Sequence, residues 1–112
     1  MRVHHVNLHV PSGLLEEEST FLVDVLGFRK AEPPPEFASI AHWFEDDDGV
    51  QVHLTVIDDK PPLDPGHVAV VLGDQFDEVV SRLQAEDEVF RGDIRLLLRR
   101  DPANNLWELR DA

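Results

Sequence analysis

The run His5–Val10, HVNLHV, carries the pattern on which the fold of this chain depends. Its aliphatic residues Val6, Leu8 and Val10 alternate with polar ones, which is the period of a β-strand that has one packed face and one open face. The pattern returns at an offset of 62 (67 − 5 = 62) in the run His67–Leu72, HVAVVL. The chain is therefore predicted to contain one structural unit twice, with a histidine on the open face where each copy begins.

A second pair of matching runs lies near the end of each copy. Val52–Leu54, VHL, corresponds to Trp107–Leu109, WEL, at an offset of 55 (108 − 53 = 55). In both runs the polar residue falls on the face opposite its apolar neighbours. The smaller offset is consistent with a shorter second copy. The candidate ligands that the two copies present are His5, His53, His67 and Glu108.

The segments between these runs predict the order β-α-β-β-β in each copy. In the first copy a helix follows Pro11–Gly13 and ends at Gly27. The acidic runs Glu16–Glu18, in its first turn, and Asp46–Asp48, in a hairpin turn, are interpreted as solvated surface. The remaining elements are expected as strands at about 28–32, 37–45, 49–57 and 67–72, a helix around 76–83, and strands at about 88–91, 93–100 and 105–110.

These elements predict one domain, 1–112, built from two modules. The first module covers about 1–57, the linker 58–66 contains Pro61, Pro62 and Pro65, and the second module covers about 67–112. A pseudo-twofold axis between the modules would bring the four candidate ligands together. Eight short strands in a small chain leave open sheet edges, which predicts a homodimer.

Composition narrows the class of partner. Ten basic against 23 acidic residues give a formal charge of −13, which argues against binding nucleic acid or an anionic membrane. The absence of cysteine excludes disulfides, thiolate metal sites and thiol nucleophiles. No apolar run approaches the ~20 residues of a membrane span, and Met1–Val3 leads into a strand rather than a signal peptide. The predicted location is the cytoplasm.

Five short motifs follow one another along the chain: HVNLHV at 5–10, LGF at 26–28, VHLT at 52–55, GHVA at 66–69 and DPANNLWEL at 101–109. In the order and spacing of these motifs, the chain resembles the glyoxalase/bleomycin-resistance/extradiol-dioxygenase proteins, the vicinal oxygen chelate superfamily. The resemblance covers nearly all 112 residues. It implies an α+β fold in which the two βαβββ modules form a curved eight-stranded mixed sheet around a metal cleft.

The resemblance also implies a metal site. His5, His67 and Glu108 match a two-histidine, one-carboxylate triad, and His53 matches a fourth position that is often glutamate in glyoxalase I and is not a ligand in several other branches. His53 could instead bind substrate or transfer a proton, since an ordinary imidazole titrates near ~6.5. A further departure is Ala103–Asn105, ANN, where a glycine usually precedes the asparagine.

Three imidazoles and a carboxylate suit Zn, Ni, Co, Mn or Fe(II). With few protein ligands, such a metal keeps positions open for substrate or water and acts as a Lewis acid on a chelating pair of oxygens, whereas Fe(II) would permit oxygen activation. One carboxylate beside a doubly charged cation leaves the site positive. The predicted partner is therefore a small molecule that is anionic or rich in oxygen.

Three further residues are candidates for ligand binding: Trp43, Arg95 and Arg99. Trp43 and Phe44 occupy opposite faces of one predicted strand, so one should pack and the other should line the cleft. Arg95 and Arg99 share one face of the strand at 93–100. If that face is the cleft they would suit an anionic substrate; alternatively, they balance nearby carboxylates.

Two function classes remain open. The first is a glyoxalase-like metal-dependent enzyme, a lyase, isomerase or dioxygenase, acting on a small vicinal-oxygen substrate. The second is a metal-free protein of the bleomycin-resistance type that sequesters a small molecule. In that branch the metal positions are normally replaced, and this chain retains all four, which favours the enzyme.

Overall fold

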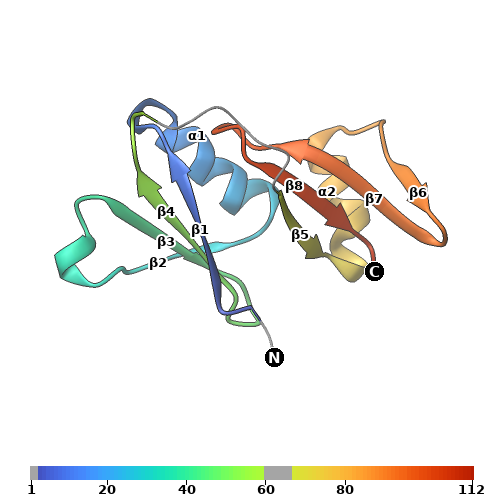
Figure 1. The fold of residues 1–112 in the computed structure, drawn as a ribbon. Helices are drawn as coiled ribbons and strands as arrows, with labels where there is room; N and C mark the ends of the chain where they lie inside the picture. The colour runs from blue at the N-terminus through green and yellow to red at the C-terminus, as the bar shows by residue number, and fades with distance from the viewer. Residues whose placement is uncertain (1–2, 60–66) are drawn as a thin grey trace. The chain divides into compact units, whose positions relative to one another are not determined.

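The computed structural model describes residues 3–59 and 67–112 (Figure 1). The chain divides into two compact units, Met1–Pro62 and Leu63–Ala112. The division falls inside the predicted linker 58–66. The three linker prolines lie outside the described residues.

The first unit has the element order β-α-β-β-β. Its elements are β1 His5–Val10, α1 Leu15–Thr20, β2 Arg29–Ala31, β3 Ala41–Glu45 and β4 Gln51–Val56. The strands form a four-stranded sheet in the order β1-β4-β3-β2, where β1 is parallel to β4 and the other neighbours are antiparallel. This mixed pairing puts β1 and β4 side by side although α1, β2 and β3 come between them in the sequence.

The first helical segment is more irregular than its sequence pattern predicts. A 3-10 turn, Ser12–Leu14, precedes α1, and a π-helix, Phe21–Val25, follows it. The prediction that the whole run Glu16–Glu18 is solvated is wrong for Glu18, whose exposed fraction is 0%. Glu18 is buried because it lies four residues before Leu22, on the helix face that packs.

β3 begins later than the strand predicted at 37–45. The residues before it form a 3-10 turn, Pro35–Phe37, with proline at its first position, and the strand starts at Ala41. Proline suits the first position of such a turn, because its fixed φ is already helical and it has no N–H to leave unpaired. The triple-proline segment is therefore a turn rather than the start of a strand.

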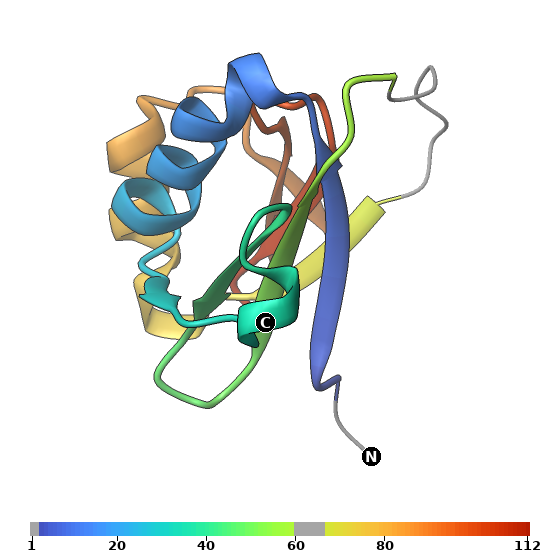
Figure 2. The same cartoon turned by 90° about the vertical axis from the view of Figure 1, so that its left-hand side faces the viewer.

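Figure 2 shows α1 standing against one face of the first sheet. Aliphatic and aromatic residues of the strands on that face are buried, and they make the core of this unit with the helical segment: Val10, Phe21, Leu22, Phe44, Val52 and Leu54. The alternation of the strands then directs their polar residues to the opposite, open face.

The second unit repeats the arrangement. Its elements are β5 His67–Val71, α2 Phe76–Leu83, β6 Val89–Arg91, β7 Ile94–Arg100 and β8 Leu106–Arg110, and a 3-10 turn at Gly73–Gln75 leads into α2. The sheet order is β5-β8-β7-β6, with β5 parallel to β8. Its core combines Phe76 and Val79 of α2 with buried strand residues.

The two sheets agree in register as well as in order. Asn7 is the strand partner of His53, and Ala69 is the partner of Glu108. The second pair follows the first at the same two offsets that the sequence shows, 62 and 55 (69 − 7 = 62; 108 − 53 = 55). The predicted fold class, α+β with two βαβββ modules, is confirmed, with the eight strands distributed over two four-stranded sheets.

The hairpins that precede the last strand of each module are also built alike. Asp46 N donates to Val50 O and Gly49 N to Asp46 O; Asp101 N donates to Asn105 O and Asn104 N to Asp101 O. The fourth residue of each turn has positive φ, 82° at Gly49 and 72° at Asn104. Asparagine tolerates this conformation better than most residues, so the turn forms without the glycine that its motif usually contains.

In residues 3–59 and 67–112, none of the helices is long and apolar enough to span a membrane.

Candidate functional site

His53 lies on the open face of the first module between two other rings. Its imidazole is stacked on Trp43, with ring centroids 3.9 Å apart and planes 1° from parallel, and on His5, at 4.2 Å and 14°. Trp43 is the strand partner of His53 on β3. His5 is two positions from the partner on β1, so the three side chains share one face.

The surroundings of His53 favour its neutral form. The His53 side chain donates from Nε2 to Gln51 Oε1 at 2.8 Å, so Nδ1 retains its lone pair. Burial lowers the pKa of His53, and the neighbouring imidazoles of His5 and His4 lower it further by Coulomb repulsion. A neutral imidazole with a free lone pair is the form that binds a metal or accepts a proton.

His4 and His5 contact each other at the start of β1. Their Nδ1 atoms are 2.9 Å apart, so that one ring donates a hydrogen bond to the other. Both residues are exposed. This contact orients the His5 ring.

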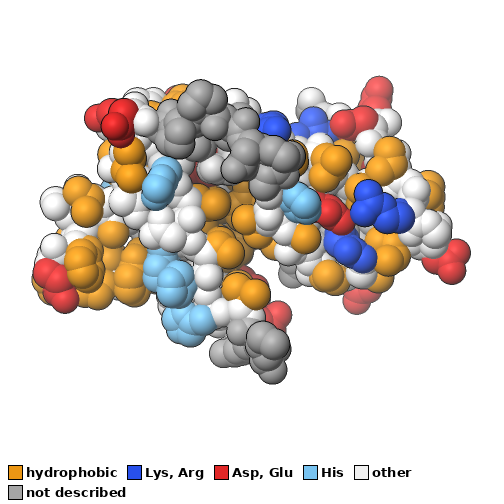
Figure 3. All heavy atoms as spheres, in the orientation of Figure 1, with side chains coloured by type: hydrophobic (Ala, Val, Ile, Leu, Met, Phe, Trp, Pro, Cys, Tyr) orange, Lys and Arg blue, Asp and Glu red, His pale blue; other side chains and the backbone are white. Residues whose placement is uncertain are grey.

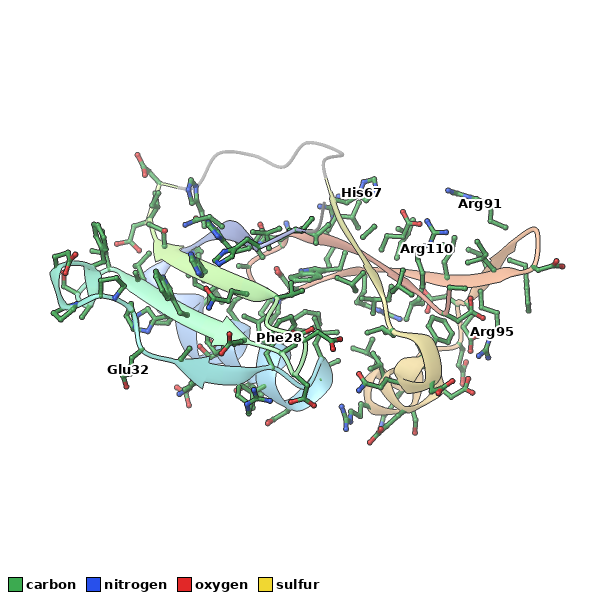
Figure 4. All side chains as sticks on the ribbon, turned by 90° about the horizontal axis from the view of Figure 1, so that it is seen from below. Phe28, Glu32, His67, Arg91, Arg95 and Arg110 are labelled. Atoms are coloured by element: carbon green, nitrogen blue, oxygen red, sulfur yellow. The ribbon has the colours of Figure 1, made fainter. Side chains whose placement is uncertain are left out.

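The equivalent face of the second module carries His67 and Glu108. His67 Nε2 is 3.3 Å from Glu108 Oε2, and Arg110 Nη1 is 3.6 Å from Glu108 Oε1. The Glu108 side chain is only 10% exposed, and its Oε1 atom has no hydrogen-bond donor within the described residues. Figure 4 shows His67 and Arg110 on the same side of the strands. A buried carboxylate oxygen with spare acceptor capacity is suited to bind a cation.

Each module thus offers two of the four predicted ligands. Within the part of each module that the structure describes, no three His, Asp or Glu side chains come together as a possible metal site. The structure therefore brings the predicted ligands together in pairs, His5 with His53 and His67 with Glu108. Figure 3 shows histidines along the open face of the first module, and a histidine beside acidic and basic side chains on the second.

Arg95 and Arg99 lie on the other face of the second sheet. On β7 and β8, Leu98 is the partner of Glu108, whereas Arg99 is the partner of buried Trp107. Figure 4 shows Arg95 on the side of the strands where α2 lies, and its guanidinium carbon is 4.8 Å from the centroid of the Phe76 ring. A role in binding a ligand beside Glu108 would require the two arginines to lie on the Glu108 face. Neither does, so the prediction that they face the same cleft as Glu108 is wrong.

Carboxylates neutralise these two arginines. Arg95 donates to Asp77 at 2.8 Å and to Asp111 at 3.2 Å, and Arg99 donates to Asp87 at 2.8 Å. The aspartates beside Arg95 raise its pKa. The alternation along β7 separates its two faces, but it does not show which face packs against α2. Buried leucines lie on both faces, at Leu96 and Leu97.

Trp43 and Phe44 divide between the two faces of β3 as expected. Phe44 is buried, 1% exposed, and Trp43 lies on the face of His53. A role for Trp43 in binding a ligand stays a prediction.

Three arginines that the sequence argument overlooked share the open face with Glu108. The register of β6, β7 and β8 places Arg91, Arg100 and Arg110 on that face. The signal for Arg110 was present in the sequence, since a residue two positions after Glu108 on a strand points the same way. Arg100 could be assigned only once the register between β7 and β8 was known.

The first module also contains a hollow of about 720 Å³ away from its histidine pair. It lies between the helical segment and strands β2 and β3, with Phe44 among its apolar lining. Neither His5 nor His53 lines it. Its charged and titratable lining residues are Glu16, Asp24, Lys30, Glu32 and His42.

Solved structures with the same fold support the architecture. The chain matches a protein from Bacillus anthracis assigned to the glyoxalase family at a TM-score of 0.81 and 22% identity, over 98% of this chain and 93% of that one. A glyoxalase/dioxygenase from Nostoc punctiforme matches at 0.76 and 20%, over 97% and 89%. No family model and no curated protein sequence matches the chain.

A third structure adds information about ligands. A mutant of the fosfomycin resistance protein FosX from Listeria monocytogenes, in complex with Mn(II) and 1S,2S-dihydroxypropylphosphonic acid, matches at a TM-score of 0.73 and 21% identity, over 99% of this chain and 92% of that one. At such identities the likeness establishes the fold. The chain therefore has the paired-module fold of glyoxalase, dioxygenase and fosfomycin-resistance structures, as its motifs predicted.

Proposed function

We propose that the chain is a divalent-metal-dependent enzyme of the glyoxalase-like kind, acting on a small, anionic or oxygen-rich molecule with vicinal oxygens. In this proposal His5, His53, His67 and Glu108 bind one metal ion, which is Zn, Ni, Co, Mn or Fe(II). The reaction is of the lyase, isomerase or dioxygenase type.

The observation that carries the proposal is that Glu108 has a buried carboxylate oxygen without a hydrogen-bond donor among the described residues. The carboxylate is nearly buried, and His67 Nε2 is 3.3 Å from Oε2. The atom without a donor is Oε1, from which the Arg110 guanidinium, at 3.6 Å, is too far to donate a hydrogen bond. A buried carboxylate is normally satisfied by donors or by a cation. The donor set of imidazole nitrogens and a carboxylate oxygen matches the preference of the borderline metals named above.

The first module supports the same reading through His53. Its lowered pKa keeps the imidazole neutral, and the Gln51 contact leaves the Nδ1 lone pair available. Trp43 stacks on one face of the ring and His5 on the other, which restricts its rotation. Secondary contacts of this kind orient a ligand and are commonly worth about 10–100-fold in metal affinity.

The side chains around the donors suggest how substrate and protons are handled. A metal bound there would supply Lewis-acid polarisation of two adjacent substrate oxygens. His53, held neutral near pH 7, can accept a proton at Nδ1 when that atom is not a ligand. Trp43 covers this imidazole and limits the access of water to it.

Metal content tests the proposal directly. Untagged protein, stripped with a chelator and refilled separately with Mn, Co, Ni, Zn and anaerobic Fe(II), should bind about one ion per chain, or per dimer if the ligands come from two chains. Glu108→Gln and His67→Ala should lose it. His42→Ala, a histidine on the hollow side of the first sheet, is the matched control and should bind as wild type does.

A metal-free binding protein is the alternative, and one observation favours it. The stacked rings of Trp43, His53 and His5 form a flat aromatic surface that could hold a planar molecule without a metal. If the wild-type protein binds none of the metals after refilling, the enzyme proposal is overturned and the metal-free binding protein remains. Binding lost equally in Glu108→Gln and His42→Ala would also count against the enzyme, because the metal would then not depend on the proposed ligands.

We also propose that the chain forms a homodimer in the cytoplasm. The edge strand β6 exposes Phe90 at 72% and Val89 at 51%, and exposed apolar edge strands are usually covered. Light scattering behind size exclusion should give twice the mass of 12.7 kDa, and Phe90→Lys should shift it towards the monomer.

A further inference from the structure

The arginines of the second module fall into two groups that differ in how their charge is balanced. Those on the α2 side have carboxylate partners at short range: Arg82 with Glu78 at 2.6 Å, Arg95 with Asp77 at 2.8 Å, and Arg99 with Asp87 at 2.8 Å. Those on the Glu108 face are Arg91, Arg100 and Arg110.

The arginines on the Glu108 face are poorly neutralised. In residues 3–59 and 67–112 no carboxylate pairs with Arg91 or Arg100, and the nearest to Arg110 is Glu108 at 3.6 Å. The guanidinium groups of Arg100 and Arg110 donate instead to the backbone oxygens of Asn104 and Ala112, at 3.1 Å and 3.0 Å. The protein has a formal charge of −13 and 23 acidic residues, so carboxylates are available to pair with most arginines. Arginines without a carboxylate partner on one face therefore suggest that this face binds an anion.

Two of these arginines flank Glu108. Arg110 follows it by two positions on β8, a separation of about 7 Å along a strand. Arg100 lies two positions beyond Leu98, the partner of Glu108 on β7, which makes it a diagonal neighbour at roughly 7–8 Å. Figure 4 shows Arg110 and Arg91 on the His67 side of the strands, away from Arg95. The pair of His67 and Glu108 is therefore bordered by cations.

Apolar residues lie among these charges. Leu98, opposite Glu108, is 49% exposed, and Val71, the strand partner of Arg110, is 66% exposed. A surface that combines guanidinium donors with exposed aliphatic side chains suits a small molecule with an acidic group and a short apolar body.

We infer that Arg110 and Arg100 bind the oxyanion group of such a ligand, a carboxylate or a phosphoryl group, beside Glu108. This inference rests on the proposed function for the chemistry at the other end of the ligand, and it makes Arg110 the main determinant of specificity for acidic substrates. The planar guanidinium fits either oxyanion with two parallel hydrogen bonds, which lysine cannot reproduce.

The inference is tested by anion binding to the full chain. We would titrate metal-free protein with inorganic phosphate and, separately, with acetate, at constant pH and ionic strength against chloride, and follow backbone amide and arginine Nε–H signals by NMR. We expect saturable shifts centred on Arg110 and Arg100. The tighter of the two probes identifies the group as phosphoryl or carboxylate.

Single-residue variants distinguish anion binding at a specific site from general electrostatic attraction to the protein. Arg110→Gln should weaken the tighter probe by about tenfold or more, as expected for a lost charge-assisted hydrogen bond. Arg100→Gln should weaken it less, and Arg110→Lys should recover part of the affinity. Arg82→Gln removes the same charge on the α2 side and should stay within about twofold of wild type.

Several results would overturn the inference: no saturable binding of either probe, equal loss in Arg82→Gln and Arg110→Gln, or an Arg110→Gln variant that binds as wild type does. Titration of the same variants with Mn(II) alone keeps the two proposals distinguishable. Metal binding with no arginine-dependent anion site would leave the enzyme proposal standing, whereas anion binding that depends on Arg110 without metal binding would leave only this inference.

Discussion

In the first module His53 is held between the rings of Trp43 and His5, whereas in the second module the equivalent residue, Glu108, lies between His67 and Arg110. The backbone does not account for this difference, because His53 and Glu108 occupy the same register position on their last strands. The side chains across the sheet differ instead. The strand partner of His53 is Trp43, and that of Glu108 is Leu98, again at an offset of 55 (98 − 43 = 55).

The comparison shows how a duplicated scaffold can hold two kinds of polar side chain at equivalent positions. An aromatic partner buries and stacks an imidazole, which keeps the imidazole neutral. An aliphatic partner leaves room for a carboxylate with charged neighbours. The repeat sets the position of His53 and Glu108, and the residue opposite each of them sets its surroundings.

The equivalent hairpin turns differ in a similar way. Asp101 is 4% exposed and accepts hydrogen bonds from Asn105 N, Asn105 Nδ2 and Trp107 Nε1. Asp46 accepts from the backbone N–H groups of Asp48 and Val50 and is only half-buried. One turn is thus anchored in the core by an indole, and the other is a surface turn.

The largest expected effect follows from this difference between the turns. Asp101→Ala should destabilise the protein by about 3 kcal/mol, because buried donors of Asn105 and Trp107 lose a charged acceptor. Asp46→Ala should cost about 1 kcal/mol, since water can replace its bonds. Urea unfolding followed by circular dichroism measures both. Equal costs would show that the buried indole contact adds nothing.

The next effect concerns the aromatic stack. Trp43→Leu gives the first module the residue that the second has, and it should cost about 1–2 kcal/mol through lost stacking and packing. Leu98→Ala, at the equivalent position, should cost about 0.5 kcal/mol or less because Leu98 is half exposed. Thermal unfolding measures both variants. A larger loss for Leu98→Ala would contradict the distinction drawn between the two faces.

A smaller effect is expected where the turns carry a positive φ. Gly49→Ala should cost about 1 kcal/mol, since φ is 82° there and a Cβ atom is strained in that region. Asn104→Gly should change stability by less than about 0.5 kcal/mol, because asparagine already tolerates its φ of 72°. The sign of each change is read from denaturant midpoints. A strong stabilisation by Asn104→Gly would show that the asparagine turn is strained.

The smallest effect is on pH dependence, since it involves one proton on His53. In metal-free protein the pKa of His53 should lie below its ordinary value of about 6.5, because burial and the adjacent histidines oppose its charge. A lowered pKa means that the unfolded chain takes up the proton first. This contribution to stability is therefore fully present above about pH 6.5 and is lost as pH falls from there through the folded-state pKa.

Proton NMR titration measures this pKa, and Trp43→Leu should raise it towards the ordinary value by exposing the ring. His53→Gln removes the titrating group and should flatten the loss of stability below about pH 6.5. A pKa of about 6.5 or higher in the wild-type protein would contradict the account of His53 as a buried neutral imidazole.

Much of the fold was predictable from the sequence, because repeats and strand alternation are local signals. The element order of both modules followed from runs such as His5–Val10 and from turn residues such as Gly49. The element ends were less accurate. The strand expected at 37 begins at Ala41, and the first helix contains a π-helical stretch at Phe21–Val25, since competing hydrogen-bond patterns differ by too little energy for a local pattern to decide.

The candidate site was predictable in part. That His5 and His53 share a face, and that His67 and Glu108 do so, follows from alternation within short runs and from the repeat. The burial of Glu18 was not predicted, because a run of three glutamates gives no sign of which one faces the core. Alternation also left open whether Arg95 and Arg99 face a ligand or balance carboxylates, and the structure pairs both with carboxylates on the face opposite Glu108.

By itself, then, the sequence determined the number and order of the elements, the repeat and the pairs of residues that point the same way. Each of these depends on the geometry of a few consecutive residues. Only the tertiary structure decided which face of β7 packs on α2, which arginines stay unbalanced beside Glu108, and which aromatic ring covers His53. These depend on pairings between distant strands, and alternation separates two faces of a strand without saying which one is buried.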